Sequence, residues 1–232
     1  MKALILAAGK GKRLRPLTFK IPKCLVKVKG RPLLFHWLKS LESTDIENVF
    51  INTHWLADEV ENYLSEEKFN LKVSTKFEKE LLGSAGTISF NFNSFKNDDL
   101  LVIYGDNYTQ FNLNEIISFH KKNEREVTVG AFLTDKPTKC GILEIDEFLN
   151  GISFIEKPSL PKSNLAAAGI YIFSKNILKK INTLKINHNG AYDIGYHVMP
   201  KIIRKSKIFK IEGHLIDIGD IDSLNFANNL KE

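Results

Sequence analysis

The sequence predicts an α/β fold with a single, doubly wound, mainly parallel sheet, helices on both faces and a small antiparallel portion in the second half. In the first half, apolar runs of strand length alternate with segments of helical periodicity. This alternation is typical of a parallel sheet built from strand–helix–strand units. In the second half, strand-like runs follow one another with only short connections, which favours antiparallel hairpins.

The first half contains a predicted helix that starts behind Pro32, because apolar residues recur there at helical spacing, namely Leu33, Leu34, Trp37, Leu38 and Leu41. Ligands of such a sheet bind at the carboxyl ends of its strands. In chain order we expect strands at 4–6, 48–53, 71–76 and 100–104, and helices at 33–41, 56–64, 84–90 and 113–120.

The second half is predicted to form strands first and helices later. Asp220 is suited to be the N-cap of the closing helix, since a carboxylate can accept hydrogen bonds from the first free N–H groups. We expect strands at 126–132, 141–145, 151–155, 166–173 and 208–211, and helices at 174–181, 191–203 and 220–230.

Length and composition fit one folded domain over residues 1–232, with 43% hydrophobic and 26% charged residues. No apolar run approaches about 18 residues, and Met1 leads directly into a predicted core strand, so we expect a cytoplasmic protein with no membrane partner. Cys24 and Cys140 match no metal or redox spacing, which agrees with a reducing compartment.

The net charge is +6, from 33 basic and 27 acidic residues. Such a surface can serve nucleic acid, anionic membranes or small phosphorylated substrates. The basic residues are scattered, except for a tight group after the first strand, and no recognised nucleic-acid module is present. The charge therefore favours small phosphates and gives no support to a nucleic-acid partner.

That tight group lies in a glycine-containing loop. A dinucleotide fingerprint needs a glycine where Leu14 stands, and the spacing of Gly9, Gly11 and Arg13 does not supply a Walker phosphate loop. What remains is Gly-x-Gly-x-Arg, in which small residues let main-chain N–H groups approach a phosphate while Arg13 and Lys23 neutralise its charge. A glycine-rich surface turn is the alternative.

The stretch 6–18, followed by Pro22-Lys23, resembles the signature of the sugar-1-phosphate nucleotidylyltransferases. The resemblance implies a Rossmann-like, GT-A-like nucleotidyltransferase fold, a nucleotide-binding half at 1–110, a sugar-phosphate-binding half at 111–232, and no C-terminal β-helix domain. It implies that the loop embraces a nucleoside triphosphate, with contacts from Leu6, Ala8, Gly9, Gly11, Lys12 and Arg13.

Two aspartates are candidate metal ligands. Asp106 follows a buried strand within Gly105-Asp106-Asn107, where it can hold Mg²⁺ or simply form a turn. Asp217 stands between two isoleucines, so it lies either at a metal or beside a buried partner, because an unpaired charge there would be costly. The resemblance implies that Asp106 and Asp217 bind Mg²⁺.

Glu156 and Lys157 precede Pro158 and, without context, are most simply a surface ion pair. In the family this turn binds the sugar phosphate, so the resemblance implies that Glu156 contacts sugar hydroxyls and that Lys157 contacts the phosphate. Other sugar-phosphate contacts are expected at Gly141, Asn164 and Ala167. Ala167 replaces the family's usual asparagine, and Asn164 is the residue that can compensate.

The stretch from Glu80 to Gly86 resembles the family's segment that contacts the nucleotide base and ribose, with Leu81 and Ser84 in place of Pro and Thr. Small residues at the start of a helix let a flat ring or a phosphate approach the main chain. The expected nucleotide contacts here are Glu80, Gly83 and Ser84.

The implied reaction joins a nucleoside triphosphate and a sugar 1-phosphate, giving a nucleoside diphosphate sugar and pyrophosphate. The attacking phosphate is already an anion, so catalysis requires positioning and charge neutralisation and no protein base. Arg13, Lys23, Asp106 and Lys157 are the predicted catalytic residues, and Mg²⁺ is the predicted cofactor.

The overall pattern looks closest to mannose-1-phosphate and manno-heptose-1-phosphate guanylyltransferases, which favours GTP. UTP-, CTP- or dTTP-dependent members stay open, including the uridylyltransferases acting on N-acetylmuramate 1-phosphate. Two other classes are alternatives: a non-catalytic regulatory subunit, which commonly loses residues that this chain keeps, and a glycosyltransferase, which the loop disfavours. A homodimer is compatible with the sequence.

Overall fold

The computed structural model describes residues 1–123, 125–186 and 188–230. The chain forms two compact units, neither of which is one continuous stretch. Unit 1 comprises Met1, Leu82–Val102 and Asn114–Glu212, and unit 2 comprises Lys2–Leu81, Ile103–Leu113 and Gly213–Glu232. Each unit therefore draws on both halves of the sequence. The sequence predicts that residues 1–110 bind the nucleotide and that residues 111–232 bind the sugar phosphate. This division concerns ligands, which the two units do not test, so it stays a prediction.

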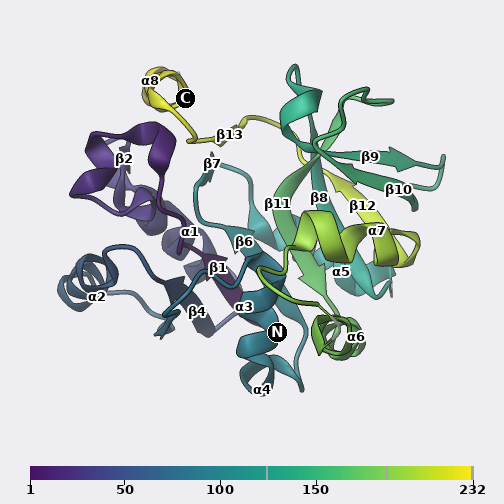
Figure 1. Ribbon diagram of the computed structural model, residues 1–232, viewed down its shortest axis with the longest axis horizontal. Coiled ribbons are helices and arrows are strands. Elements are labelled where there is room, and N and C mark those ends of the chain that lie inside the picture. Colours follow the sequence, from purple (N-terminus) through teal and green to yellow (C-terminus); the bar gives the residue numbers. More distant parts are fainter. Residues whose placement is uncertain (124, 187, 231–232) are drawn as a thin grey trace. The chain divides into compact units, whose positions relative to one another are not determined.

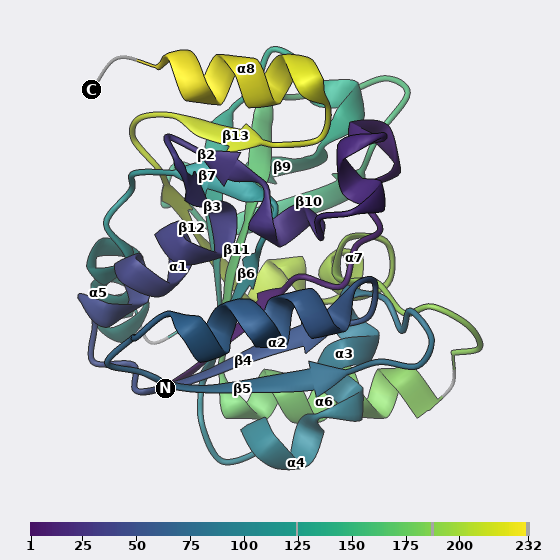
Figure 2. The same ribbon diagram turned by 90° about the vertical axis from the view of Figure 1, so that its left-hand side faces the viewer.

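Unit 2 is built on parallel strands. Its elements are β1 (Lys2–Leu6), β2 (Lys27–Val28), β3 (Arg31–Pro32), α1 (Leu33–Glu42), β4 (Asn48–Thr53), α2 (Ala57–Glu66), β5 (Lys72–Phe77), β7 (Asn107–Thr109), β13 (Leu215–Asp217) and α8 (Ile221–Asn229). β1 pairs with β4 and β4 with β5, both in parallel. Figures 1 and 2 both place α2 beside β4. Ala3, Leu4 and Ile5 are fully buried, as expected of a strand covered on both faces.

Two short strand pairs and α8 complete unit 2. β2 pairs with β3 and β7 with β13, both antiparallel, and α8 runs along β13 (Figure 2). The predicted cap of α8 is confirmed, because Ser223 N donates to Asp220 Oδ1 at 2.9 Å in a capping box. One apolar cluster ties these parts together: Leu14, Val26, Val28, Leu33, Tyr108, Ile216, Ile218 and Ala227.

Unit 1 contains the antiparallel strands. Its elements are α3 (Ser84–Phe90), α4 (Phe92–Phe95), α5 (Leu113–Asn123, whose first residue belongs to unit 2), β8 (Val127–Leu133), β9 (Gly141–Ile145), β10 (Gly151–Glu156), β11 (Leu165–Phe173), α6 (Lys175–Ile186), α7 (Met199–Ile202) and β12 (Ser206–Lys210). β11 pairs antiparallel with β8 and β9, and β9 with β10. β12 adds to β8 in parallel. β6 (Leu100–Tyr104) has three residues in unit 1 and two in unit 2. The predicted antiparallel portion is confirmed.

One helix begins later than predicted. The sequence predicts a helix over 191–203, whereas residues 191–193 are not helical and the segment starts at Ile194 as a turn of π-helix before α7. The Asp193 carboxylate accepts hydrogen bonds from Gly195 N at 2.8 Å and Tyr196 N at 3.2 Å. Asp193 therefore caps the helical segment and fixes its first residue.

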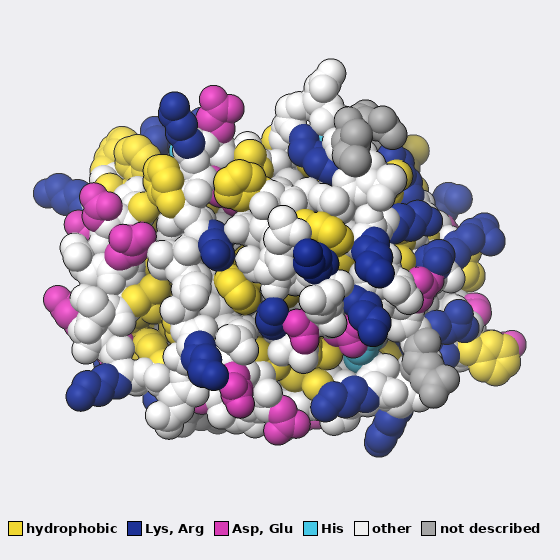
Figure 3. All heavy atoms as spheres, turned by 90° about the horizontal axis from the view of Figure 1, so that it is seen from below, with side chains coloured by type: hydrophobic (Ala, Val, Ile, Leu, Met, Phe, Trp, Pro, Cys, Tyr) yellow, Lys and Arg dark blue, Asp and Glu magenta, His cyan; other side chains and the backbone are white. Residues whose placement is uncertain are grey.

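Among the residues described, no helix is long and apolar enough to cross a membrane. On the face displayed in Figure 3, Lys and Arg side chains are interspersed with Asp and Glu. The excess positive charge is thus mixed with negative charge on this face.

Candidate active site

The loop after β1 folds back on itself at Gly11. Its φ of 57° lies in the left-handed region that favours glycine, and its carbonyl accepts hydrogen bonds from Thr18 Oγ1 at 2.8 Å and Leu14 N at 2.9 Å. A Cβ at residue 11 would lie 2.9 Å from Thr18 Cγ2 and 3.3 Å from Lys23 Cβ. A Cβ at Gly9 would meet none of the described residues within 4 Å, so packing against them does not require glycine there.

A buried polar network holds the end of β1. Ala7 N donates to Asn52 Oδ1 at 2.6 Å, and Asn52 Nδ2 donates to Glu78 Oε1 at 2.9 Å. Asn52 and Glu78 are only 4% and 2% exposed. Gly105 N donates to Leu6 O at 2.9 Å, which attaches the Gly-Asp turn to the same strand end. The start of the loop is therefore fixed by bonds within unit 2.

Lys23 lies between the two predicted metal ligands. Its Nζ is 2.5 Å from Asp106 Oδ2 and 3.3 Å from Asp217 Oδ1, and its side chain is only 10% exposed. Arg13 Nη2 lies 3.7 Å from Asp217 Oδ2. Burial alone lowers the pKa of Lys23, but the charges of Asp106 and Asp217 outweigh it and raise that pKa above its ordinary value. Lys23 is therefore a cation at neutral pH.

The pairing of β7 with β13 brings the two aspartates together. Asn107 stands opposite Asp217 in this pair, and Ile218 N donates to Asp106 O at 3.0 Å. The glycine of the Asp-Ile-Gly motif has a packing role, because a Cβ at Gly219 would lie 2.8–3.0 Å from the Arg13 guanidinium. Arg13 thus lies flat against Gly219 beside Asp217.

The donor set fits Mg²⁺. Asp106 and Asp217 supply carboxylate oxygens, the ligands that Mg²⁺ prefers, and their side chains are 37% and 56% exposed. Both carboxylates converge on one positive charge, the Lys23 ammonium. The described part of the chain holds no cluster of three or more such ligands, and Mg²⁺ commonly takes its remaining ligands from water and substrate phosphates.

In unit 1, Glu156 lies over two glycines. A Cβ at Gly141 would lie 2.7 Å from Glu156 Oε2, and a Cβ at Gly195 would overlap that same oxygen. Burial raises the pKa of the Glu156 carboxyl; Lys157 acts against this and Asp193 adds to it. The two glycines thus make room for a carboxylate that is held close to the main chain.

The backbone conformation at Lys157 determines where its side chain starts. Its φ of 47° is in the left-handed region, which is uncommon for a residue with a side chain, and its N–H donates to Cys140 O at 3.0 Å. Its Nζ lies 3.9 Å from Glu156 Oε1 while its side chain stays 53% exposed. The lysine can therefore reach a phosphate in solvent, and the local strain is of the kind found at functional sites.

The start of α3 is held by Tyr192. Tyr192 N donates to Leu82 O at 2.8 Å, and Tyr192 O accepts from Ala85 N at 2.9 Å and Gly86 N at 2.8 Å. A Cβ at Gly83 would lie 2.6 Å from Tyr192 O. Since the N–H groups of Ala85 and Gly86 are bonded within unit 1, they are not free donors for a phosphate, which favours the approach of a flat ring here.

The remaining predicted residues lie outside these clusters. Lys12, Glu80 and Asn164 are exposed. Ala8 is buried, and Ala167 is half-buried on β11 opposite Ala131. Sequence reasoning missed Asn52 and Glu78 of unit 2 and the segment at Tyr192 and Asp193 of unit 1. The available signal for Asn52 was its position as a polar residue inside the apolar strand predicted at 48–53.

Comparison with known proteins shows which protein family this chain resembles. Residues 2–232 match a family model described as Nucleotidyl transferase. A mannose-1-phosphate guanylyltransferase catalytic subunit beta of Xenopus tropicalis is 30% identical over 226 residues, which cover 94% of this chain and 61% of that protein. A Sulfolobus acidocaldarius protein with the provisional name mannose-1-phosphate guanyltransferase is 32% identical over 223 residues, with coverages of 94% and 60%. The chain spans about 60% of the length of these curated relatives.

Among the solved structures that share the fold are two crystal structures. One, provisionally named a glucose-1-phosphate thymidylyltransferase from Bacillus anthracis, has a TM-score of 0.88 at 26% identity and covers 100% of this chain and 97% of that one. The other, HddC from Yersinia pseudotuberculosis, has a TM-score of 0.81 at 26% identity, with coverages of 98% and 97%. The predicted α/β fold is confirmed. Because the family model spans nearly the whole chain, this protein belongs to the nucleotidyl transferase family, as the resemblance of its opening loop predicted.

Proposed function

We propose that this protein is a sugar-1-phosphate nucleotidylyltransferase, which joins a nucleoside triphosphate and a sugar 1-phosphate to give a nucleoside diphosphate sugar and pyrophosphate. The observation that carries the proposal is the cluster of unit 2 in which Lys23 and Arg13 lie against Asp106 and Asp217. Cations that neutralise phosphates and carboxylates that hold Mg²⁺ are what phosphoryl chemistry requires. The family membership of the chain supports the same reaction.

In the proposed reaction, a phosphate oxygen of the sugar 1-phosphate attacks the α-phosphorus in line. A new oxygen–phosphorus bond forms, the bond to the bridging oxygen of the β-phosphate breaks, and pyrophosphate leaves with that electron pair. Lys23 neutralises charge near the α-phosphate, Arg13 stabilises the departing pyrophosphate, and Lys157 holds the attacking phosphate. Mg²⁺ held by Asp106 and Asp217 would supply further neutralisation of phosphate oxygens.

We propose the same substrate contacts that the sequence predicts. Glu156 accepts hydrogen bonds from sugar hydroxyls, a role that suits a carboxylate held close to the main chain by its two glycines. Further contacts to the sugar phosphate come from Gly141, Asn164 and Ala167. Contacts to the nucleotide come from Leu6, Ala8, Gly9, Gly11, Lys12, Glu80, Gly83 and Ser84.

For the substrates, we propose GTP and a mannose- or heptose-type sugar 1-phosphate. The support is that relatives at 30–32% identity are named mannose-1-phosphate guanylyl transferases. UTP, CTP or dTTP with another sugar 1-phosphate is the alternative, and the name of the Bacillus anthracis structure favours keeping dTTP among the nucleotides to test. We place the reaction in the cytoplasm, in keeping with two free cysteines, Cys24 and Cys140.

The test is a matrix of common nucleoside triphosphates against a panel of sugar 1-phosphates with Mg²⁺, read by pyrophosphate release. The expected result is turnover with one nucleotide and a narrow set of sugars, and its loss in Arg13→Ala and Asp106→Asn proteins that remain folded. Unchanged turnover in either variant would contradict the assigned roles. Binding of a nucleotide sugar without Mg²⁺-dependent pyrophosphate release would instead favour a non-catalytic regulatory subunit.

A further inference from the structure

A short turn of unit 1, residues 192–197, contacts two residues to which different substrates are assigned. Its main chain at Tyr192 is bonded to the start of α3, where Ser84 lies, and its glycine, Gly195, lies under the carboxylate of Glu156. Asp193 stands between these two contacts in the sequence. The motifs that carry the family resemblance do not include this turn, and the proposed reaction assigns it no role.

One oxygen of Asp193 fixes Ser84. Ser84 Oγ donates its proton to Asp193 Oδ2 at 2.8 Å, and Ile194 N donates to Ser84 Oγ at 2.8 Å. The hydroxyl is thus both a donor and an acceptor within unit 1, which sets its rotamer. Any contact of Ser84 with a nucleotide is therefore made in the orientation that Asp193 imposes.

The other oxygen of Asp193 fixes the chain beneath Glu156. Asp193 Oδ1 accepts hydrogen bonds from Gly195 N at 2.8 Å and from Tyr196 N at 3.2 Å. A Cβ on Gly195 would lie 2.8 Å from Glu156 Cδ and 3.3 Å from Asp193 Oδ1. The position of Gly195 therefore decides how far the Glu156 carboxylate can settle toward the main chain.

We propose that Asp193 is a positioning residue that sets Ser84 through one carboxylate oxygen and Glu156 through the other, and so couples nucleotide binding to sugar-phosphate binding within unit 1. The assignment of the two substrates rests on the proposed function. Asp193 acts on both substrates through other residues, since both of its oxygens are bonded within the protein. This predicts effects on the two KM values more than on kcat.

Two substitutions of Asp193 distinguish the roles of its two carboxylate oxygens. In Asp193→Asn the amide oxygen still accepts the N–H groups of Gly195 and Tyr196, but the amide nitrogen cannot accept the proton of Ser84. We expect KM for the nucleoside triphosphate to rise by about tenfold while KM for the sugar 1-phosphate changes by less than about threefold. In Asp193→Ala both KM values should rise by about tenfold. In a Ser84→Ala background, Asp193→Asn should add nothing to KM for the nucleotide, because Asp193 acts on the nucleotide through Ser84.

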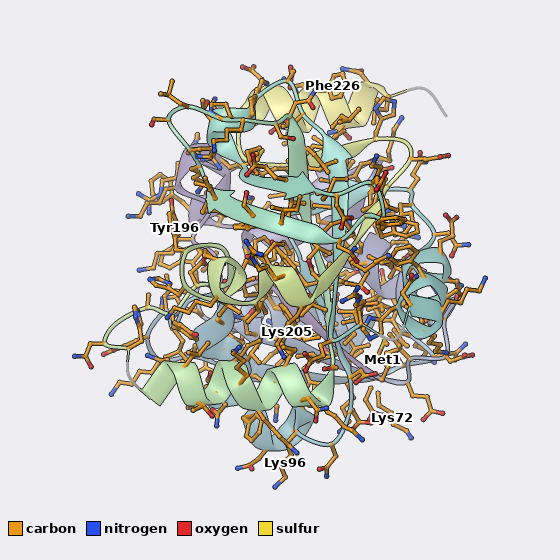
Figure 4. The ribbon with its side chains drawn as sticks, turned by 90° about the vertical axis from the view of Figure 1, so that its right-hand side faces the viewer. Met1, Lys72, Lys96, Tyr196, Lys205 and Phe226 are labelled. Carbon is orange, nitrogen blue, oxygen red and sulfur yellow. The ribbon has the colours of Figure 1, made fainter. Side chains whose placement is uncertain are left out.

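Matched controls come from exposed positions of the same unit. Asp135→Ala removes an exposed carboxylate, and Tyr196→Phe removes a hydroxyl from the same turn; Tyr196 is 55% exposed and lies at the surface in Figure 4. Both controls should keep wild-type KM values. The proposal is overturned if Asp193→Ala leaves both KM values unchanged, if Asp193→Asn and Asp193→Ala act alike on both substrates, or if the losses lie in kcat and thermal stability alone.

A readout on the free protein keeps this result distinct from the proposed function. If the wild-type protein turns over no substrate pair, the proposed function fails, and amide hydrogen exchange then tests the positioning role of Asp193 directly. Asp193→Asn should speed exchange at Ile194 and leave Gly195 and Tyr196 protected, whereas Asp193→Ala should speed exchange at all three amides. Equal protection of these amides in the wild-type protein and both variants would refute the positioning role.

Discussion

Replacing Lys23 by methionine tests the centre of the candidate active site. Methionine keeps most of the length of the side chain but removes the ammonium, which lies 2.5 Å from Asp106 Oδ2 and 3.3 Å from Asp217 Oδ1. Without it, phosphate loses a preorganised cation, and loss of one such contact typically lowers kcat by about 10²–10³-fold. We expect that loss in pyrophosphate release.

The same substitution has a stability effect that can be worked from the structure. Two charge-assisted hydrogen bonds are lost, each worth about 1.5–3 kcal/mol when buried. Asp106 and Asp217 are 37% and 56% exposed, so water can solvate the freed carboxylates, and we expect a net loss of about 2 kcal/mol, or a Tm lower by about 4–8 °C. Because the two carboxylates then face less positive charge, with the Arg13 guanidinium still 3.7 Å from Asp217, Mg²⁺ should stabilise the variant more than the wild-type protein.

The assays are pyrophosphate release and thermal unfolding with and without Mg²⁺. At about ten times its dissociation constant, Mg²⁺ should add about 1.4 kcal/mol to the stability of the variant. Lys20→Met, at an exposed lysine of the same loop, is the matched control and should change neither measurement. Turnover of Lys23→Met near the wild-type rate, or equal stabilisation of both proteins by Mg²⁺, would show that the ammonium does not hold this position in solution.

Three further predictions use other residues. Gly219→Ala places a Cβ within 3.0 Å of the flexible Arg13 guanidinium, so we expect kcat for pyrophosphate release to fall by about tenfold with an unchanged Tm; full activity would contradict the packing of Arg13 on this glycine. Burial, with an added contribution from Asp193, raises the pKa of Glu156, so its ionised form is disfavoured in the folded state. Glu156→Gln should therefore stabilise the free protein in urea unfolding at pH 7–8, with a gain that disappears below the pKa of an unfolded glutamate, about 4.3; a gain that grows on acidification would refute the sign. Asn52→Ala removes the acceptor of the Ala7 N hydrogen bond and one donor to the buried Glu78 carboxylate, and should lower the free energy of unfolding by about 2–4 kcal/mol, measured with urea; a loss below about 0.5 kcal/mol would mean that water replaces Asn52.

Much of the candidate site could be predicted from the sequence because its parts are local. The loop at 9–13 follows a continuous apolar strand, and Asp106 follows another, so both were expected at strand ends. Periodicity also predicted the strand at 48–53 and the helix at 84–90 with the bounds that the structure shows. The helix predicted over 191–203 failed at its start because a side-chain cap, which periodicity does not register, sets that boundary.

By itself, then, the sequence determined the α/β class, the family resemblance and the identity of the charged residues, because hydrophobic periodicity and short motifs are written in neighbouring positions. Only the tertiary structure decided that Lys23 lies between Asp106 and Asp217, that Arg13 lies on Gly219, and that Asp193 bonds Ser84 while Gly195 lies under Glu156. These contacts depend on the register of β7 with β13 and on a turn that meets α3 more than a hundred residues away in the chain. Such pairings are set by packing and hydrogen bonding between distant segments, and no local pattern in a single sequence records them.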